Sequence, residues 1–528
     1  MKGIISKRCF KTISVIVILC LLMYMSINWM MLNEQETVMI SWQSLAHMLP
    51  SAGLVITGLS CIVIAGLNNR VRPEWLFLII YIVLETMYLT VIPLSSTPDE
   101  TEHWLRAYGI SQGDFVPETN DEGEGGSYVP SNITYMWNRS GSRIRDMRDN
   151  LMMEASQDRA FLTYSNTALY SPLTYAPQTI GISLARLICN KPYLWAYAGR
   201  LTNMLTVGLI IFAAIRIAPA GKNIIATLTL LPINMYESAS LSGGAFTYAV
   251  TVMLISYVLW LRYKKQGEMT RKEKLFLYLL LLFTASCKIV YVPFALMAFA
   301  VPPDKLGDRK KYRFHIFCAA IMILTASLGW MSISRRYLIE YKPGVDSIAQ
   351  MKFVLMHPIN YVQTIINTVM YSGEWIIKTF FAASLGYFNV GTNLLMMTVS
   401  AANLIYVCVT DRLVIRSTEK EEDNKQILLF MLLASSVISA LLVFTSEYVQ
   451  WTPYQDKSVD GLQGRYFLPV LLPMLILIKE KIFVYAKDGS GTKKVEEVYG
   501  DEKGMMYPGM LICFVNLMTI ITLFVSYI

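Results

Sequence analysis

Long runs of apolar residues alternate with shorter polar segments along the whole chain. Most of these runs approach the roughly 20 residues that an α-helix needs to cross a bilayer, which predicts about thirteen membrane-spanning helices. The predicted spans are 12–31, 49–68, 75–94, 193–216, 224–239, 245–263, 275–287, 289–301, 314–333, 394–409, 427–446, 466–478 and 507–528. The predicted fold class is therefore an all-α integral membrane protein.

Two long segments between these spans are too polar to cross a membrane. We predict that 95–192 is one large loop, in which the apolar helix 178–188 is too short to span and lies in the membrane interface. We predict that 334–393 is a second large loop. Charged residues interrupt its apolar positions at helical spacing over 346–378, which indicates external helices and not a span.

Lysine and arginine gather in a subset of the connecting loops, and this fixes the predicted topology. The basic segments are the N-terminal 1–11 and the loops 264–274, 309–313, 412–416 and 479–494. The positive-inside rule places them in the cytoplasm. The N-terminus is then cytoplasmic, and both large loops and the C-terminus are extracytoplasmic.

The composition agrees with a membrane location. Of the 528 residues, 54% are hydrophobic and 16% are charged, against roughly 25% charged in soluble domains. The net charge of +8 lies in the cytoplasmic loops, so it predicts contact with the lipid bilayer and no binding of nucleic acid. The eight cysteines have no CxxC spacing and there are only four histidines, so neither a disulfide framework nor a multi-histidine metal site is predicted.

A dense group of ionisable residues begins where the span 75–94 ends: Asp99, Glu100, Glu102, His103 and Arg106. Burial and neighbouring charges shift pKa values, so one of these carboxylates could serve as a base or a metal ligand at neutral pH. The alternative is a solvated loop end. Asp99, Glu100, Glu102 and His103 are the catalytic candidates, and Arg106 is a candidate for substrate binding.

Further polar groups lie at the predicted outer ends of other spans: Glu237, Lys288, and Arg465 with Tyr466. Polar residues at membrane depth are costly, so they are candidates for substrate binding. Lys288 suits a lipid phosphate, and the guanidinium of Arg465 suits a diphosphate. The structural alternatives are a partnered Glu237, a snorkelling Lys288 and an Arg465 that only anchors the interface.

Six short motifs follow one another along the chain. They are Pro98-Asp99-Glu100-x-x-His103-x-x-Arg106-Ala107-Tyr108, Gly199-Arg200-Leu201-Thr202-Asn203, Ala239-Ser240-Leu241-Ser242, Lys288-Ile289-Val290-Tyr291-Val292-Pro293, Ser384-Leu385-Gly386-Tyr387 and Gln463-Gly464-Arg465-Tyr466-Phe467-Leu468-Pro469. In order and spacing they resemble the DUF2142 family of bacterial membrane proteins, over about 75–478. The resemblance implies two additional N-terminal helices in 1–72, a family-like membrane domain in 73–480, and a cytoplasmic loop with a last helix in 481–528.

That family is grouped with the GT-C glycosyltransferases, which take a sugar from a polyprenyl-phosphate donor at the outer membrane face. The resemblance therefore implies transfer to a saccharide or lipid acceptor during cell-envelope polysaccharide or glycolipid assembly. It makes Asp99 the base or the ligand of a divalent cation, Mg²⁺ or Mn²⁺, and makes Lys288 and Arg465 phosphate contacts. The chain departs from the family pattern at Gly244, where relatives usually carry an aspartate, and Glu237 is the candidate replacement.

Two other functions fit the same residues. A transporter or flippase of lipid-linked saccharides also needs cations for phosphates, but it would carry polar residues along the mid-depth of several helices. Here they lie mainly at the predicted outer ends. A non-catalytic membrane protein that binds lipid-linked glycan is the second alternative, and Gly244 is its best support.

Overall fold

The computed structural model describes residues 72–136, 150–411, 413–414, 419–480, 498–499 and 506–527. The first two predicted spans lie outside these residues. In the described part, six helices are long and apolar enough to cross a membrane. They belong to α3 (Pro73–Val91), α8 (Pro192–Ile217), α11 (Gly243–Tyr263), α14 (Arg309–Ser334), α18 (Glu419–Gln450) and α20 (Met506–Tyr527). The predicted helical membrane protein is confirmed, whereas the figure of about thirteen spans is not.

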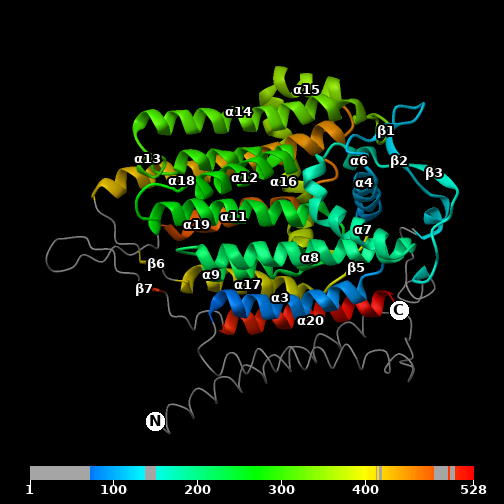
Figure 1. Cartoon of the computed structure of the whole chain (residues 1–528), viewed down its shortest axis with the longest axis horizontal. Helices are drawn as coiled ribbons and strands as arrows, with labels where there is room; N and C mark the ends of the chain where they lie inside the picture. The colour runs from blue at the N-terminus through cyan, green and yellow to red at the C-terminus, as the bar shows by residue number, and fades with distance from the viewer. Residues whose placement is uncertain are drawn as a thin grey trace, which may run out of the picture.

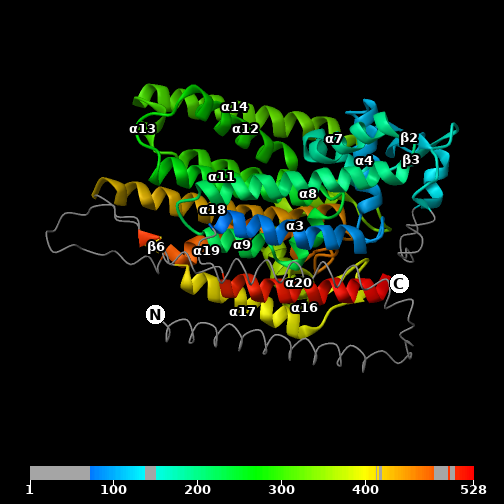
Figure 2. The same cartoon turned by 60° about the horizontal axis from the view of Figure 1, so that its bottom comes forward.

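The long helices run side by side in one bundle (Figures 1 and 2). In the most apolar part of α11, 89% of the residues are buried, against 11% in α14, so α11 is central and α14 is peripheral. Helix α3 packs between α8 and α20. The hydroxyl of Tyr81 donates to the Met204 carbonyl at 3.0 Å, and that of Tyr88 donates to Asn516 Oδ1 at 2.9 Å.

Two of the predicted spans differ from a regular α-helix. The predicted span 224–239 is two short helices, α9 (Lys222–Thr229) and α10 (Pro232–Ser238), because Pro232 lacks an N–H and starts a new helix. After α12 (Arg271–Cys287), the predicted span 289–301 is the 3₁₀ helix η3 (Ile289–Ala300). A 3₁₀ helix rises about 2.0 Å per residue, so this short segment extends further than an α-helix of equal length.

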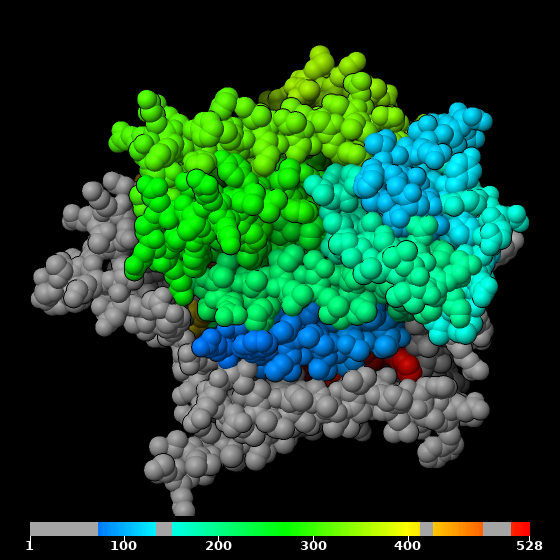
Figure 3. All heavy atoms as spheres, viewed as in Figure 1, coloured from blue at the N-terminus to red at the C-terminus, as the bar shows by residue number. Residues whose placement is uncertain are grey.

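The first large loop folds into a small subdomain at one end of the bundle (Figure 3). Its elements are α4 (Glu100–Gln112), β1 (Glu118–Thr119), β2 (Gly125–Pro130), η1 (Ser131–Met136), β3 (Arg159–Thr163), α6 (Ser165–Ala168), η2 (Pro172–Tyr175) and α7 (Ala176–Ile188). The strands form an antiparallel sheet in the order β1-β2-β3, with Gly126 opposite Thr163. Trp104, Tyr108 and Trp195 stack in its core.

The segment 334–393 is helical over most of the part that was predicted to form helices. Its elements are η4 (Arg335–Tyr337), α15 (Ser347–Met356), α16 (Pro358–Phe380), β4 (Ser384–Leu385) and β5 (Val390–Gly391). The remaining elements are α13 (Pro303–Leu306), α17 (Leu394–Thr410), β6 (Leu413–Val414), η5 (Gly464–Phe467), α19 (Leu468–Glu480) and β7 (Val498–Tyr499).

The loops are sorted between the two ends of the bundle. Elements α13, β6 and β7, which lie in or next to the segments that the charge pattern assigns to the cytoplasm, lie at the end opposite α4 (Figure 1). The C-terminal end of α20 lies at the same end as α4. The described loops therefore separate into the two groups that the positive-inside rule predicts.

Candidate functional site

A cavity of about 360 Å³ opens at the end of the bundle where α4 begins. This volume is within the range of small-molecule binding sites. Six of the predicted site residues line it: Asp99, His103, Glu237, Lys288, Arg465 and Tyr466. They come from the start of α4, from α10, from the junction of α12 and η3, and from η5, so the fold gathers residues that are far apart in the sequence.

Arg465 links two of the carboxylates in this cavity. Its Nη1 donates to Glu237 Oε1 at 2.5 Å, and its Nη2 lies 3.4 Å from Asp99 Oδ2. The side chains of Arg465 and Glu237 are 9% and 6% exposed, whereas that of Asp99 is 45% exposed. The buried pair is a strong, charge-assisted contact and the Asp99 contact is a weaker one.

The backbone of Asp99 directs its carboxylate into the cavity. Asp99 is the N-cap of α4, but it adopts the left-handed region with φ +61° and ψ +11°. An N-cap aspartate usually accepts a hydrogen bond from the first turn of its helix. Here the side chain makes no such bond. The carboxylate can therefore contact Arg465 and face the cavity.

Lys288 supplies a second cation. It lies between α12 and η3 in an extended conformation, and its Nζ lies 4.6 Å from the ring centre of Tyr170 and 5.9 Å from that of Tyr466. Among the residues that the structure describes, no carboxylate is paired with this ammonium. Aromatic faces stabilise a cation without supplying a negative charge, so an anionic ligand would be the counter-ion of Lys288 in this cavity.

His103 is a neutral imidazole in the wall of the cavity. Its Nδ1 is hydrogen-bonded to the hydroxyl of Tyr175 at 2.7 Å. Burial lowers the pKa of His103 well below its usual range, and the charges of Lys288 and Arg465 add to this effect. A neutral histidine can orient a hydroxyl or exchange a proton with it.

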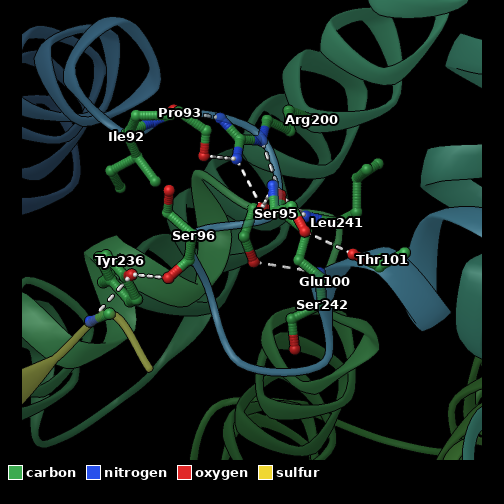
Figure 4. A network of polar contacts seen from close by, with 12 residues as sticks. Ile92, Pro93, Ser95, Ser96, Glu100, Thr101, Arg200, Tyr236, Leu241 and Ser242 are labelled. Atoms are coloured by element: carbon green, nitrogen blue, oxygen red, sulfur yellow. Dashed lines mark hydrogen bonds and ion pairs between the residues drawn. The ribbon is translucent and has the colours of Figure 1, made fainter. Parts of the chain in front are cut away.

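Glu100 points away from the cavity, and its carboxylate makes its contacts within the fold. Both of its carboxylate oxygens accept from Arg200, at 2.7 Å and 2.6 Å, and the backbone N–H groups of Ser95 and Leu241 also donate to it (Figure 4). Arg200 also donates to the carbonyls of Ile92 and Pro93, and neither charged side chain is exposed. This ion pair ties the end of α3 and the start of α4 to α8.

Arg106 and Glu102 also lie outside the lining of the cavity. Arg106 is buried and donates to the carbonyls of Asp114 and Phe115, at 3.0 Å and 2.9 Å, which fixes the turn after α4. The carbonyl of Glu102 accepts a hydrogen bond from Thr167 at 3.0 Å. The structure therefore brings Asp99 and His103 to the other candidates and directs Glu100, Glu102 and Arg106 elsewhere.

The sequence reasoning missed part of the lining. The last turn of α18 contributes Glu447 and Gln450, the residue after it is Trp451, and the first large loop contributes Tyr170. Glu447 is an acid at the end of the apolar run 427–446, and that position is the one signal that could have marked it. The carboxylate of Glu447 makes no hydrogen bond or ion pair to another described residue, unlike those of Asp99 and Glu237.

Gly244, at the start of α11, also lines the cavity. A β carbon built there would lie 3.3 Å from Glu237 Oε2 and 3.2 Å from Ser242 Oγ. An acidic side chain at this position would therefore lie beside Glu237.

Comparison with known proteins gives the family. The family model described as predicted membrane protein (DUF2142) matches residues 77–474. The chain belongs to this family. The match covers every residue of the cavity discussed above. Comparison with curated proteins and with solved structures found no match.

A bound Mg²⁺ or Mn²⁺ needs several oxygen or nitrogen donors that face one point. Within the described residues, no three His, Cys, Asp or Glu side chains are grouped so that they could hold a metal ion. Arg465 also occupies the carboxylates of Asp99 and Glu237. The arrangement does not fit a metal site built from protein ligands alone.

Proposed function

We propose that the protein is a GT-C-type glycosyltransferase that takes a sugar from a polyprenyl-phosphate donor at the outer membrane face. The observation that carries this proposal is the meeting of Lys288 and Arg465 with Asp99 in one cavity at an end of the membrane bundle. A phosphate leaving group needs fixed cations, and an acceptor hydroxyl needs a carboxylate.

The residues divide into two roles on this proposal. Lys288 and Arg465 bind the donor phosphate and stabilise the charge that develops on it. The acceptor oxygen attacks the anomeric carbon of the sugar, the bond from that carbon to the phosphate oxygen breaks, and Asp99 takes the hydroxyl proton. The product is a glycosylated saccharide or lipid, and polyprenyl phosphate is released.

The alternative functions are distinguished by different observations. A flippase would carry charged groups through the middle of the bundle. Glu85 of α3 is a buried acid of this kind, and it is the observation that favours a flippase. Its carboxylate accepts a hydrogen bond from Ser238 within the helix packing. A non-catalytic glycan-binding protein is favoured by Gly244, because the acid usual in the family is missing at that point of the cavity wall.

Release of undecaprenyl phosphate from undecaprenyl-phosphate glucose, galactose and mannose tests the proposal, with the full chain in lipid nanodiscs and mixed oligosaccharides as acceptors. Asp99→Asn should insert and fold normally but lose about 10²-fold in turnover, the effect of a lost general base. The control is Asp121→Asn, an exposed acid of the same loop, which should keep full turnover.

Two results would contradict the proposal. Turnover by Asp99→Asn at the wild-type rate would remove Asp99 from the mechanism. Binding of all three donors by the wild type without any release of undecaprenyl phosphate would favour the non-catalytic alternative.

A further inference from the structure

We propose that the C-terminal end of α18, together with Trp451 directly after it, forms a saccharide-binding subsite of the cavity. Trp451 packs against the apolar face of a sugar ring, and Glu447 and Gln450 bind its hydroxyl groups. The inference rests on the proposed function only for the role of this sugar in transfer. Binding itself can be measured without transfer.

The three residues form one face of the helix end. Glu447, Gln450 and Trp451 are spaced i, i+3 and i+4, which places side chains next to one another on a helix. All three line the cavity. Together they offer two carboxylate oxygens, an amide group and an indole ring within one helical turn.

Glu447 is the carboxylate of this cavity that the protein leaves without a partner. Asp99 and Glu237 are both paired with Arg465. Among the described residues, nothing donates to the carboxylate of Glu447 and no cation lies within ion-pair distance of it. A half-buried carboxylate without hydrogen bonds is costly, so a ligand that donates hydroxyl hydrogens to it would be stabilised.

Trp451 is held rigidly but is not covered. Its ring centre lies 5.6 Å from that of Tyr341 and 5.8 Å from Lys342 Nζ. Gly461, with φ +76°, packs so closely that a β carbon there would overlap the indole. Even so, 38% of Trp451 is exposed. A fixed, exposed indole in a cavity wall provides a flat apolar contact surface at low entropic cost.

This combination selects a saccharide over the other parts of a lipid-linked donor. A sugar ring has an apolar C–H face for the indole and a rim of hydroxyls for Glu447 and Gln450. A phosphate has no apolar face for the indole and, when ionised, no hydrogen to donate to Glu447. An isoprenoid chain would bury that carboxylate without supplying any hydrogen bond.

The test uses the full chain in lipid nanodiscs and saturation-transfer-difference NMR with the methyl glycosides of glucose, galactose, mannose and N-acetylglucosamine. We expect ring C–H signals from at least one glycoside with the wild type. Trp451→Ala should abolish them, Trp451→Phe should retain them, and Glu447→Gln should weaken binding by about tenfold, the loss of one hydrogen-bond acceptor. Trp75→Ala is the matched control, since Trp75 is an exposed tryptophan outside the cavity, and it should keep the signals.

Each outcome separates this inference from the proposed function. The absence of signal with all four glycosides overturns the subsite, as does an undiminished signal from Trp451→Ala. Transfer by Trp451→Ala at the wild-type rate and acceptor KM also overturns it but leaves the glycosyltransferase intact. Glycoside binding that depends on Trp451, without release of undecaprenyl phosphate from any donor, supports the subsite and contradicts the glycosyltransferase. The Phe variant, checked by size-exclusion profile, excludes misfolding as the cause of a lost signal.

Discussion

Substitution of Glu100 should destabilise the protein without acting on the reacting groups. Glu100→Gln removes the charge that compensates Arg200, and neither side chain is exposed. It also replaces one carboxylate oxygen with an amide group, which cannot accept from the N–H of Ser95 or Leu241 that the oxygen serves now. Breaking a buried ion pair by removing one partner costs about 3–5 kcal/mol.

The half-life of the monodisperse protein at elevated temperature measures this cost, because multi-pass membrane proteins commonly unfold irreversibly. If the whole loss appears in the unfolding barrier, the half-life should shorten by roughly 10²- to 10³-fold. A double variant of Glu100 and Arg200 should lose less than the sum of the two single variants, since the partners of a broken pair are coupled.

Asp99→Asn is the control for this prediction. It changes the neighbouring acid, which is 45% exposed and lies 3.4 Å from its cation, so its effect on half-life should be small. A Glu100→Gln protein with the wild-type half-life and no turnover would refute the reasoning. In that case Glu100 would belong to the catalytic machinery and not to the frame that supports it.

Two further predictions concern the cavity wall. Because burial lowers the pKa of His103, this side chain binds fewer protons in the folded protein than in the unfolded chain below a pH of about 6.5, and the thermal midpoint should fall from pH 7.5 to pH 5.5. His103→Gln should make the midpoint less dependent on pH, whereas His357→Gln, at an exposed position, should leave the dependence unchanged. An unchanged dependence in the His103 variant would contradict the lowered pKa of His103. Gly244→Asp places a carboxylate beside Glu237 and should raise the release of undecaprenyl phosphate by up to about 10²-fold, the lower end of what a positioned acid or base contributes. The control Gly391→Asp, where open space surrounds the position, should leave this release unchanged. A decrease with Gly244→Asp would mean that the added charge competes with Glu237 for Arg465.

The helices of the bundle could be predicted well wherever an apolar run is long and uninterrupted. The prediction of 193–216 corresponds to α8 at Pro192–Ile217, and that of 245–263 to α11 at Gly243–Tyr263. The prediction of 224–239 did not include the break that Pro232 makes between α9 and α10, because hydropathy does not register it. The same insensitivity hides the 3₁₀ geometry of η3, since a 3₁₀ and an α-helix of equal apolarity look alike in a hydropathy profile.

The candidate site was predicted as a set of residues but not as an arrangement. A cluster in the sequence such as 99–106 marks a region rich in charge, yet helix geometry turns neighbouring side chains to different sides. The left-handed conformation of Asp99 separates its carboxylate from that of Glu100, and neither residue type nor spacing predicts that conformation. Glu447 was missed because its role depends on tertiary packing that brings the end of α18 to the start of α4.

The two contacts of Arg465 give the proposed reaction an order of events. The contact with Glu237 is short and buried, whereas that with Asp99 is longer and half exposed. A donor phosphate that binds Arg465 would therefore displace Asp99 more readily than Glu237, because the weaker and better solvated contact costs less to break. Asp99 would then be free to accept the proton of the acceptor hydroxyl, while Glu237 holds the guanidinium in position. The base therefore becomes available only after the donor has bound.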